Sequence, residues 1–195
     1  DVDVFVPSPG GNNQLYRNRG DGSFEEIAAD AGVHLPGENR AALWLDYDGD
    51  QDLDLLMVGG GGIGLPMFFT LFRQDTPTQF VDVTAQAGLP TNVDDHPFQH
   101  VAGLAAGDIN GDGYLDFYSA SWNGNARLYR NDTDGTFTDI GPSSGITVSI
   151  DQTWQPVFHD FDGDGWQDIY VAVDYGPNEL WINQHDETFV NVAGS

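Results

Sequence analysis

Short stretches of the chain alternate between apolar and polar residues, and one such stretch returns at intervals. It begins with phenylalanine and covers residues 24–27, 80–83, 137–140 and 189–192. Alternation of this kind is typical of a β-strand with one buried face. An apolar run precedes each stretch across a tight turn. Asp21-Gly22 and Asp134-Gly135 favour a hairpin there, because both turn positions need φ > 0. The pattern predicts four β-hairpins.

Two further strands accompany the hairpins. An apolar strand such as residues 41–45 leads into an acidic loop, and another such as residues 53–58 leaves it. The repeat then has four short strands and a period of 52–62 residues, the pattern of a propeller blade. We predict an all-β fold, a β-propeller or propeller fragment forming a single array of about four repeats. A β-sandwich is the alternative, but it would not explain such regular repetition. The units lie approximately at residues 1–54, 55–116, 117–168 and 169–195, the last of them partial.

A nine-residue acidic loop occurs three times in the chain. Oxygen-bearing side chains stand at its first, third, fifth and ninth positions: Asp46, Asp48, Asp50 and Asp54; Asp108, Asn110, Asp112 and Asp116; Asp160, Asp162, Asp164 and Asp168. So many carboxylates would repel one another if no cation lay between them. The spacing instead lets oxygens surround one hard cation, as Ca²⁺ requires. We predict about three Ca²⁺ sites that staple the repeats together.

The chain is strongly acidic. Among its 195 residues, Asp and Glu number 31 against six Lys plus Arg, which gives a formal charge of −25. Three divalent ions would leave this balance strongly negative, so nucleic acid and anionic membrane surfaces are poor partners. The chain has no cysteine, which excludes disulfides and thiolate metal sites. Calcium sites of this kind fill most readily outside cells, which favours an extracellular or periplasmic location.

One uncharged stretch, residues 55–72, approaches the length of a membrane span. Its glycines at 59–62, with Gly64 and Pro66, would break a helix. Two strands joined by a glycine-rich turn explain the stretch better, so we predict no membrane insertion.

Two motifs together resemble a known family. The acidic loop resembles the calcium loop of FG-GAP/VCBS repeats, as in integrin α-subunit propellers. The hairpin motif Leu-Tyr-Arg-Asn-x-x-Asp-Gly-x-Phe, at residues 15–24 and 128–137, is similar to that of secreted ASPIC/UnbV (cartilage acidic protein-like) proteins. The resemblance covers nearly the whole chain and implies a calcium-binding β-propeller, usually extracellular. It also implies backbone carbonyl ligands at the seventh loop position, from Asp52, Tyr114 and Trp166. It implies no single activity, because this fold hosts enzymes, lectins and adhesion modules.

The three loops are not equivalent. Gln51 stands at the sixth position, where the other loops have Gly113 and Gly165. A left-handed backbone at this position would cost Gln about 1 kcal/mol. Asn110 removes one negative charge from the second loop. We therefore expect the third loop to bind its cation most tightly.

No catalytic residue is predicted. Carboxylates committed to calcium are poor proton donors, and neither a Gly-x-Ser-x-Gly motif nor a phosphate-binding glycine loop occurs. We expect a non-enzymatic binding or assembly module, such as an adhesion, scaffold or filament-forming propeller, with a protein or glycan partner. One alternative is a lectin that holds carbohydrate through Ca²⁺ or through Trp122 or Trp154. The other is the non-catalytic part of a larger secreted enzyme.

Both ends of the chain fall inside a repeat. Residues 1–6 match residues 52–57, so Asp3 takes the ninth position of a loop whose first six residues are absent. The incomplete terminal units suggest self-assembly, in which residues 1–6 and 180–195 share one sheet within a chain or between chains. A fragment of a longer chain is the simpler alternative. Asn131 also begins a glycosylation sequon on an expected exposed turn, although turn structure explains this Asn equally well.

Overall fold

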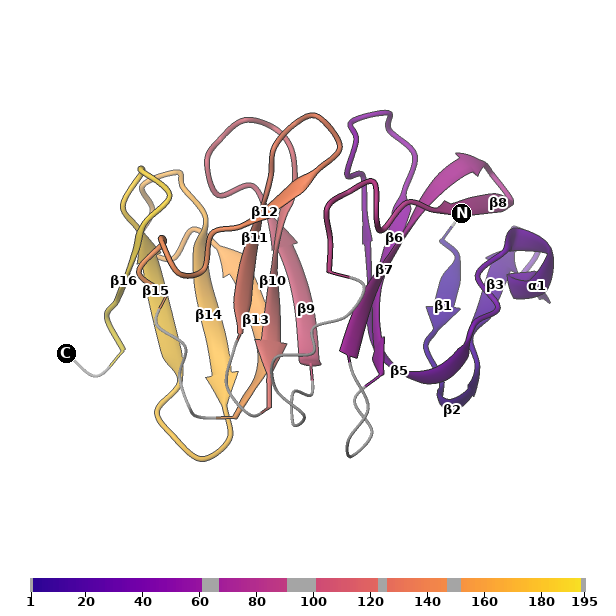
Figure 1. Cartoon of the computed structure of the whole chain (residues 1–195), viewed down its shortest axis with the longest axis horizontal. Helices are drawn as coiled ribbons and strands as arrows, with labels where there is room; N and C mark the ends of the chain where they lie inside the picture. Colours follow the sequence, from indigo (N-terminus) through magenta and orange to yellow (C-terminus); the bar gives the residue numbers. More distant parts are fainter. Residues whose placement is uncertain (1, 61–66, 91–100, 123–125, 147–151, 194–195) are drawn as a thin grey trace.

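The computed structural model describes residues 2–60, 67–90, 101–122, 126–146 and 152–193. Within them the chain forms four antiparallel sheets and one short helix, and the sheets follow one another in chain order (Figure 1). The first sheet contains β1 (Val4–Val6), β3 (Gln14–Asn18) and β4 (Phe24–Glu26), followed by helix α1 (Ala28–Ala31). The second contains β2 (Pro9–Asn12), β5 (Pro36–Leu45), β6 (Asp54–Gly60), β7 (Met67–Thr76) and β8 (Gln79–Asp82). The third contains β9 (Val101–Gly107), β10 (Asp116–Ser121), β11 (Arg127–Asn131) and β12 (Phe137–Asp139). The fourth contains β13 (Thr153–His159), β14 (Asp168–Val173), β15 (Glu179–Asn183) and β16 (Phe189–Asn191).

The predicted four-stranded repeat is confirmed. The third and fourth sheets are meanders whose strands pair in chain order, and the second adds β2 at the edge of the same meander. Four such sheets side by side form a propeller fragment, as the alternation and the period predict. In each four-stranded meander the first strand precedes an acidic loop and the other three follow it. The sheets are therefore offset along the chain from the sequence units.

The core lies between neighbouring sheets rather than inside one of them. Successive residues of β6 point to opposite faces, so Leu55 packs toward the first sheet and Leu56 toward the third. In β10, Phe117 belongs to the cluster shared with the second sheet and Tyr118 to the cluster shared with the fourth. All four side chains are at most 1% exposed. Strands buried on both faces read as mainly apolar runs, which is why the only charged residue of β6 and of β10 is the aspartate that begins each strand.

The uncharged stretch of residues 55–72 supplies two strands of this kind. β6 and β7 pair directly, from Leu55 opposite Phe72 to Gly60 opposite Met67, which confirms the two-strand interpretation. The predicted glycine-rich turn at residues 61–66 lies outside the described residues. In the part of the chain that the structure describes, no helix has the length and apolar character of a membrane span.

The hairpin turns differ from the prediction in one respect. The left-handed residues are Gly20 and Gly22, not the Asp-Gly pair itself. Asp21 lies between them and accepts hydrogen bonds from both the backbone N–H and the hydroxyl of Ser23, at 2.9 and 2.6 Å. Asp134 makes the same two bonds with Thr136. The aspartate is therefore required as a side-chain acceptor that closes the turn.

Two hairpin asparagines join neighbouring sheets. The Asn131 amide donates to the backbone carbonyl of Tyr47 at 2.7 Å, and the Asn183 amide donates to that of Ile109 at 2.8 Å. Both side chains are at most 2% exposed. The expectation that Asn131 lies on an exposed turn is therefore wrong. Its amide nitrogen is already bonded in the folded protein, so turn and inter-sheet structure, and not glycosylation, account for this residue.

The two terminal segments lie in different sheets. β1 pairs with β3 in the first sheet, whereas β15 and β16 belong to the fourth. The two ends of the chain lie at opposite ends of the array in Figure 1. The expectation that residues 1–6 and 180–195 share one sheet within a chain is therefore wrong for the described residues. Pairing between chains stays a prediction.

We predict that Asn131→Ala lowers the free energy of unfolding by about 2 kcal/mol, because it leaves the buried Tyr47 carbonyl without this donor. Urea denaturation measures the loss. Asn18→Ala is the matched control. Asn18 makes the same bond within its turn, to the Gly20 N–H, but no bond to another sheet is seen among the described residues. Equal losses in the two variants would contradict the inter-sheet role.

Candidate metal centres

The last aspartate of each acidic loop is fully buried and ties the loop to its sheet. Asp54, Asp116 and Asp168 begin β6, β10 and β14, and each is 0% exposed. One oxygen of each carboxylate accepts the N–H of the second loop residue, at 2.8–3.0 Å. The other accepts the N–H of a residue in the hairpin, at 2.7–2.9 Å. The carboxylate thus fixes where the loop stands relative to the hairpin.

The first aspartate of each loop accepts backbone N–H groups from within the loop. Asp46 accepts from Gly49 and Gln51, at 2.8 and 3.0 Å. Asp108 and Asp160 make the equivalent bonds to the fourth and sixth positions of their own loops. The sixth position is left-handed in every loop, with φ of 75° at Gln51, 89° at Gly113 and 93° at Gly165. The left-handed backbone considered for Gln51 is thereby confirmed, and its cost stays a prediction.

Two of the loops bring three carboxylates to within reach of one ion. Oxygens of Asp46, Asp48 and Asp50 lie within 4.8 Å of one another, and so do oxygens of Asp160, Asp162 and Asp168. These clusters could hold a metal ion. The first has a further feature, because Asp48 Oδ1 is buried and accepts no hydrogen bond among the described residues. A buried carboxylate oxygen without a donor fits a cation as its partner.

Burial and neighbouring charges disfavour ionised carboxylates in the absence of a cation. Burial raises the pKa of Asp54 to about 6 and that of Asp116 to about 7, against an ordinary value of 3.8. The pKa of Asp48 is also raised, first by burial and then by the charge of Asp50. A divalent cation would supply the positive charge that these three groups lack.

The second loop differs from the others at its third position. The Asn110 amide donates to Asp112 Oδ2 at 2.9 Å, so this pair is satisfied without a cation. The loop keeps the rest of the geometry, since Asp112 Oδ1 accepts the Tyr114 N–H at 2.8 Å as its counterparts do. Ligation by the carbonyls of Asp52, Tyr114 and Trp166 stays a prediction.

The third loop has a partner that the sequence did not indicate. His185, at the tip of the last hairpin, contacts Asp164 Oδ2 through Nε2 at 2.5 Å and stacks on Trp166. This hydrogen bond is the main reason that the pKa of Asp164 is lowered. Asp164 is not among the three clustered carboxylates of this loop. An alignment of the hairpins places His185 at the turn position held by Gly20 and Thr133, where a histidine is unusual among the copies.

Neighbouring loops touch through an aromatic residue. Tyr114, at the seventh position of the second loop, lies so close to Gly49 of the first that a Cβ there would come within 3.0 Å of its ring. Trp166 lies in the same way beside Gly111, with a corresponding distance of 3.8 Å. The acidic loops therefore form a continuous row along one edge of the array.

The chain is a propeller fragment whose complete blades each carry an oxygen-lined loop. This places it in a class of repeat proteins whose loops could hold a cation. A family model described as FG-GAP-like repeat matches residues 1–57, 46–119, 108–171 and 160–194. These matches cover almost the whole chain. The chain belongs to the FG-GAP-like repeat family, as the two sequence motifs predict.

Similar proteins include cartilage acidic protein 1 from two mammals. The mouse protein is 31% identical over 156 residues, covering 78% of this chain and 22% of the relative. The human protein is 26% identical over 180 residues, covering 87% of this chain and 26% of the relative. The chain thus spans about a quarter of the length of these relatives.

We predict that Gln51→Gly raises the free energy of unfolding by about 1 kcal/mol, because glycine adopts the left-handed backbone at this position without the steric cost of a Cβ atom. Gly165→Ala is the matched reverse change and should lower it by a similar amount. A Cβ at Gly165 would meet no atom within 4 Å, so the backbone alone is tested. Urea denaturation in saturating calcium measures both variants. A loss of stability in Gln51→Gly would contradict the prediction.

Proposed function

We propose that this chain is a calcium-stabilised binding or assembly module that works outside the cell. The observation that carries the proposal is the buried Asp48 Oδ1, which has no donor among the described residues and stands in a cluster of three carboxylates. A site of this kind calls for a cation. The same loop occurs three times, so we propose three Ca²⁺ ions, one in each loop.

The chemistry of the donors favours calcium over other divalent ions. All the side-chain donors are oxygens, which suits Ca²⁺ better than Zn²⁺. The loops are also lined by several carboxylates and backbone groups, whereas Mg²⁺ keeps more of its water. The second loop, with Asn110 in place of an acid, would bind most weakly of the three on charge alone.

A non-catalytic role follows from how the acids are used. The first and last aspartates of each loop accept backbone N–H groups, and a metal ion would engage further lone pairs of the clustered carboxylates. Such groups are poor proton donors and acceptors for a substrate. We propose that the module binds a protein or a glycan or assembles with further copies. An extracellular location is supported by the proposed calcium use and by relatives named for cartilage.

We predict that calcium raises the melting temperature and that chelation lowers it. A site with free calcium at a hundredfold excess over Kd stabilises the folded state by about 2.7 kcal/mol. Asp48→Asn sharpens the test. In chelator it should be at least as stable as the parent, because it removes a buried charge; in calcium it should gain less. A melting curve that EDTA leaves unchanged, on protein shown to have held metal, would contradict the proposal.

We also predict a ranking of the loops. Asp162→Ala or Asp164→Ala should lower the calcium-saturated stability more than Asp50→Ala does, because the third loop has four carboxylates and glycine at both left-handed positions. Thermal melts at one calcium concentration compare the three variants. The contact with His185 opposes the ranking for Asp164, so Asp162 is the cleaner substitution. Equal or reversed losses at Asp162 and Asp50 would contradict it.

A further inference from the structure

A pocket of about 360 Å³ has no acidic-loop residue among the lining residues that the structure describes. Its lining includes Arg40 in β5, Val101 in β9 and Trp154 in β13. These strands each run on into an acidic loop, so the pocket and the loops lie toward opposite ends of the same strands. The volume falls in the range of small-molecule sites in proteins.

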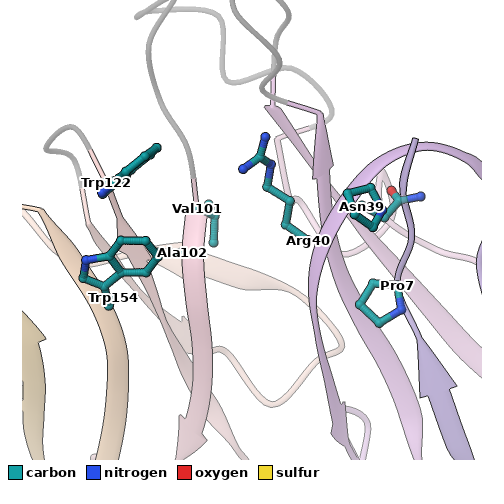
Figure 2. A pocket seen from close by; sticks show the side chains of 8 residues that line it. Pro7, Asn39, Arg40, Val101, Ala102, Trp122 and Trp154 are labelled. Carbon is teal, nitrogen blue, oxygen red and sulfur yellow. The ribbon is translucent and has the colours of Figure 1, made fainter. Parts of the chain in front are cut away.

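Two tryptophans from different sheets meet at this pocket. Trp122 follows β10 and Trp154 lies in β13, with ring centroids 5.3 Å apart and ring planes inclined by 58° (Figure 2). Trp154 remains 42% exposed, although most large apolar side chains of the sheets are packed between them. An exposed indole at a concave site offers a flat apolar surface to a ligand ring.

Arg40 supplies positive charge to the same pocket. All six arginines of this chain lie in the described residues, and five of them have a carboxylate oxygen at 3.1 Å or nearer. The Arg40 guanidinium is the exception, with Glu38 at 3.5 Å and both side chains at least 36% exposed. Figure 2 shows it beside the strand of Val101 and Ala102, which separates it from the indoles. Arg40 therefore has the longest ion-pair distance among the arginines of a chain whose net charge is −25.

We propose that this pocket binds a pyranose that carries a carboxylate, that is, a hexuronate residue of a glycan. The apolar C–H face of the sugar ring would stack on Trp154, and the ring would extend across Val101 and Ala102 so that its carboxylate points to the Arg40 guanidinium. Pro7, Val101 and Ala102 would close the apolar side. A single carboxylate suits one arginine, whereas the net charge of the chain opposes a densely charged polyanion. A proline-rich peptide would also use tryptophan, but it needs an extended groove and no anion partner.

The test compares two ligands that differ only at one carbon. Methyl β-glucuronide and methyl β-glucoside are titrated into the whole chain in saturating calcium, followed by calorimetry and tryptophan fluorescence. The glucuronide should bind at least about tenfold more tightly, because a hydrogen bond to a charged group is lost in the glucoside. Arg40→Gln should abolish that difference, and Trp154→Ala should remove the binding of both ligands.

The control variants carry comparable changes outside the pocket. Arg19→Gln alters an arginine in the turn between β3 and β4 whose side chain is 52% exposed, and Tyr175→Ala removes an aromatic residue that is 81% exposed. Both should bind the glucuronide as the parent does. Melting temperatures in calcium show whether each variant is folded. Trp154→Phe, which keeps an aromatic ring, should retain part of the affinity if Trp154→Ala fails to fold.

Equal binding of the two ligands, or no binding of either, would overturn the proposal. Binding of a proline-rich peptide that depends on Trp154 but not on Arg40 would overturn it as well. The inference rests on the proposed binding role, yet the two can fail separately. If calcium stabilises the chain and the glucuronide does not bind, only the proposed sugar site is contradicted. If the glucuronide binds and calcium does not stabilise the chain, only the proposed metal sites are contradicted.

Discussion

The structure depends on a buried carboxylate that accepts two backbone N–H groups from different parts of the chain. Asp116 is one example, since it accepts the N–H of Ile109 in the loop and the N–H of Asn131 at the hairpin. Leaving either donor unpaired in the core would cost about 1–3 kcal/mol, so the aspartate determines both loop shape and hairpin position. Asp3, which is partly buried, accepts the Asn18 N–H at 2.8 Å. The first sheet therefore keeps the hairpin half of this arrangement.

This carboxylate also explains why acidic and apolar residues are so sharply separated. The central strands are buried on both faces, so they tolerate almost no charge along their length. Acids collect where the strands begin, and there they repel one another unless a cation joins them. The amide of Asn131 then links one loop to the next sheet, and Tyr114 packs on the neighbouring loop. Metal at one loop would consequently stabilise the contacts of the next.

The two ends of the strands have different chemistry, which divides the surface into two regions. One end carries the acidic loops, where charge and backbone groups converge on positions fit for a cation. The other carries a pocket built from tryptophan and arginine side chains, with apolar walls. A repeat array gives every blade the same frame, so its differences in function arise where the residue type varies between blades. Arg40, Ala102 and Trp154 hold one such position, six residues before the first aspartate of each loop.

The sequence by itself determined the repeat, the strands and the loops, because these depend on local periodicity and on side chains close in the chain. Alternation predicted the hairpins, and the spacing of Asp46, Asp48 and Asp50 placed three carboxylates together. The tertiary structure alone decided which distant residues meet. Asn131 is buried against the neighbouring sheet, and Trp122 meets Trp154 of the next sheet. His185 meets Asp164 within the fourth sheet, where the last hairpin lies beside the acidic loop. No local pattern encodes such contacts, since they arise only when distant strands pair and whole sheets pack face to face.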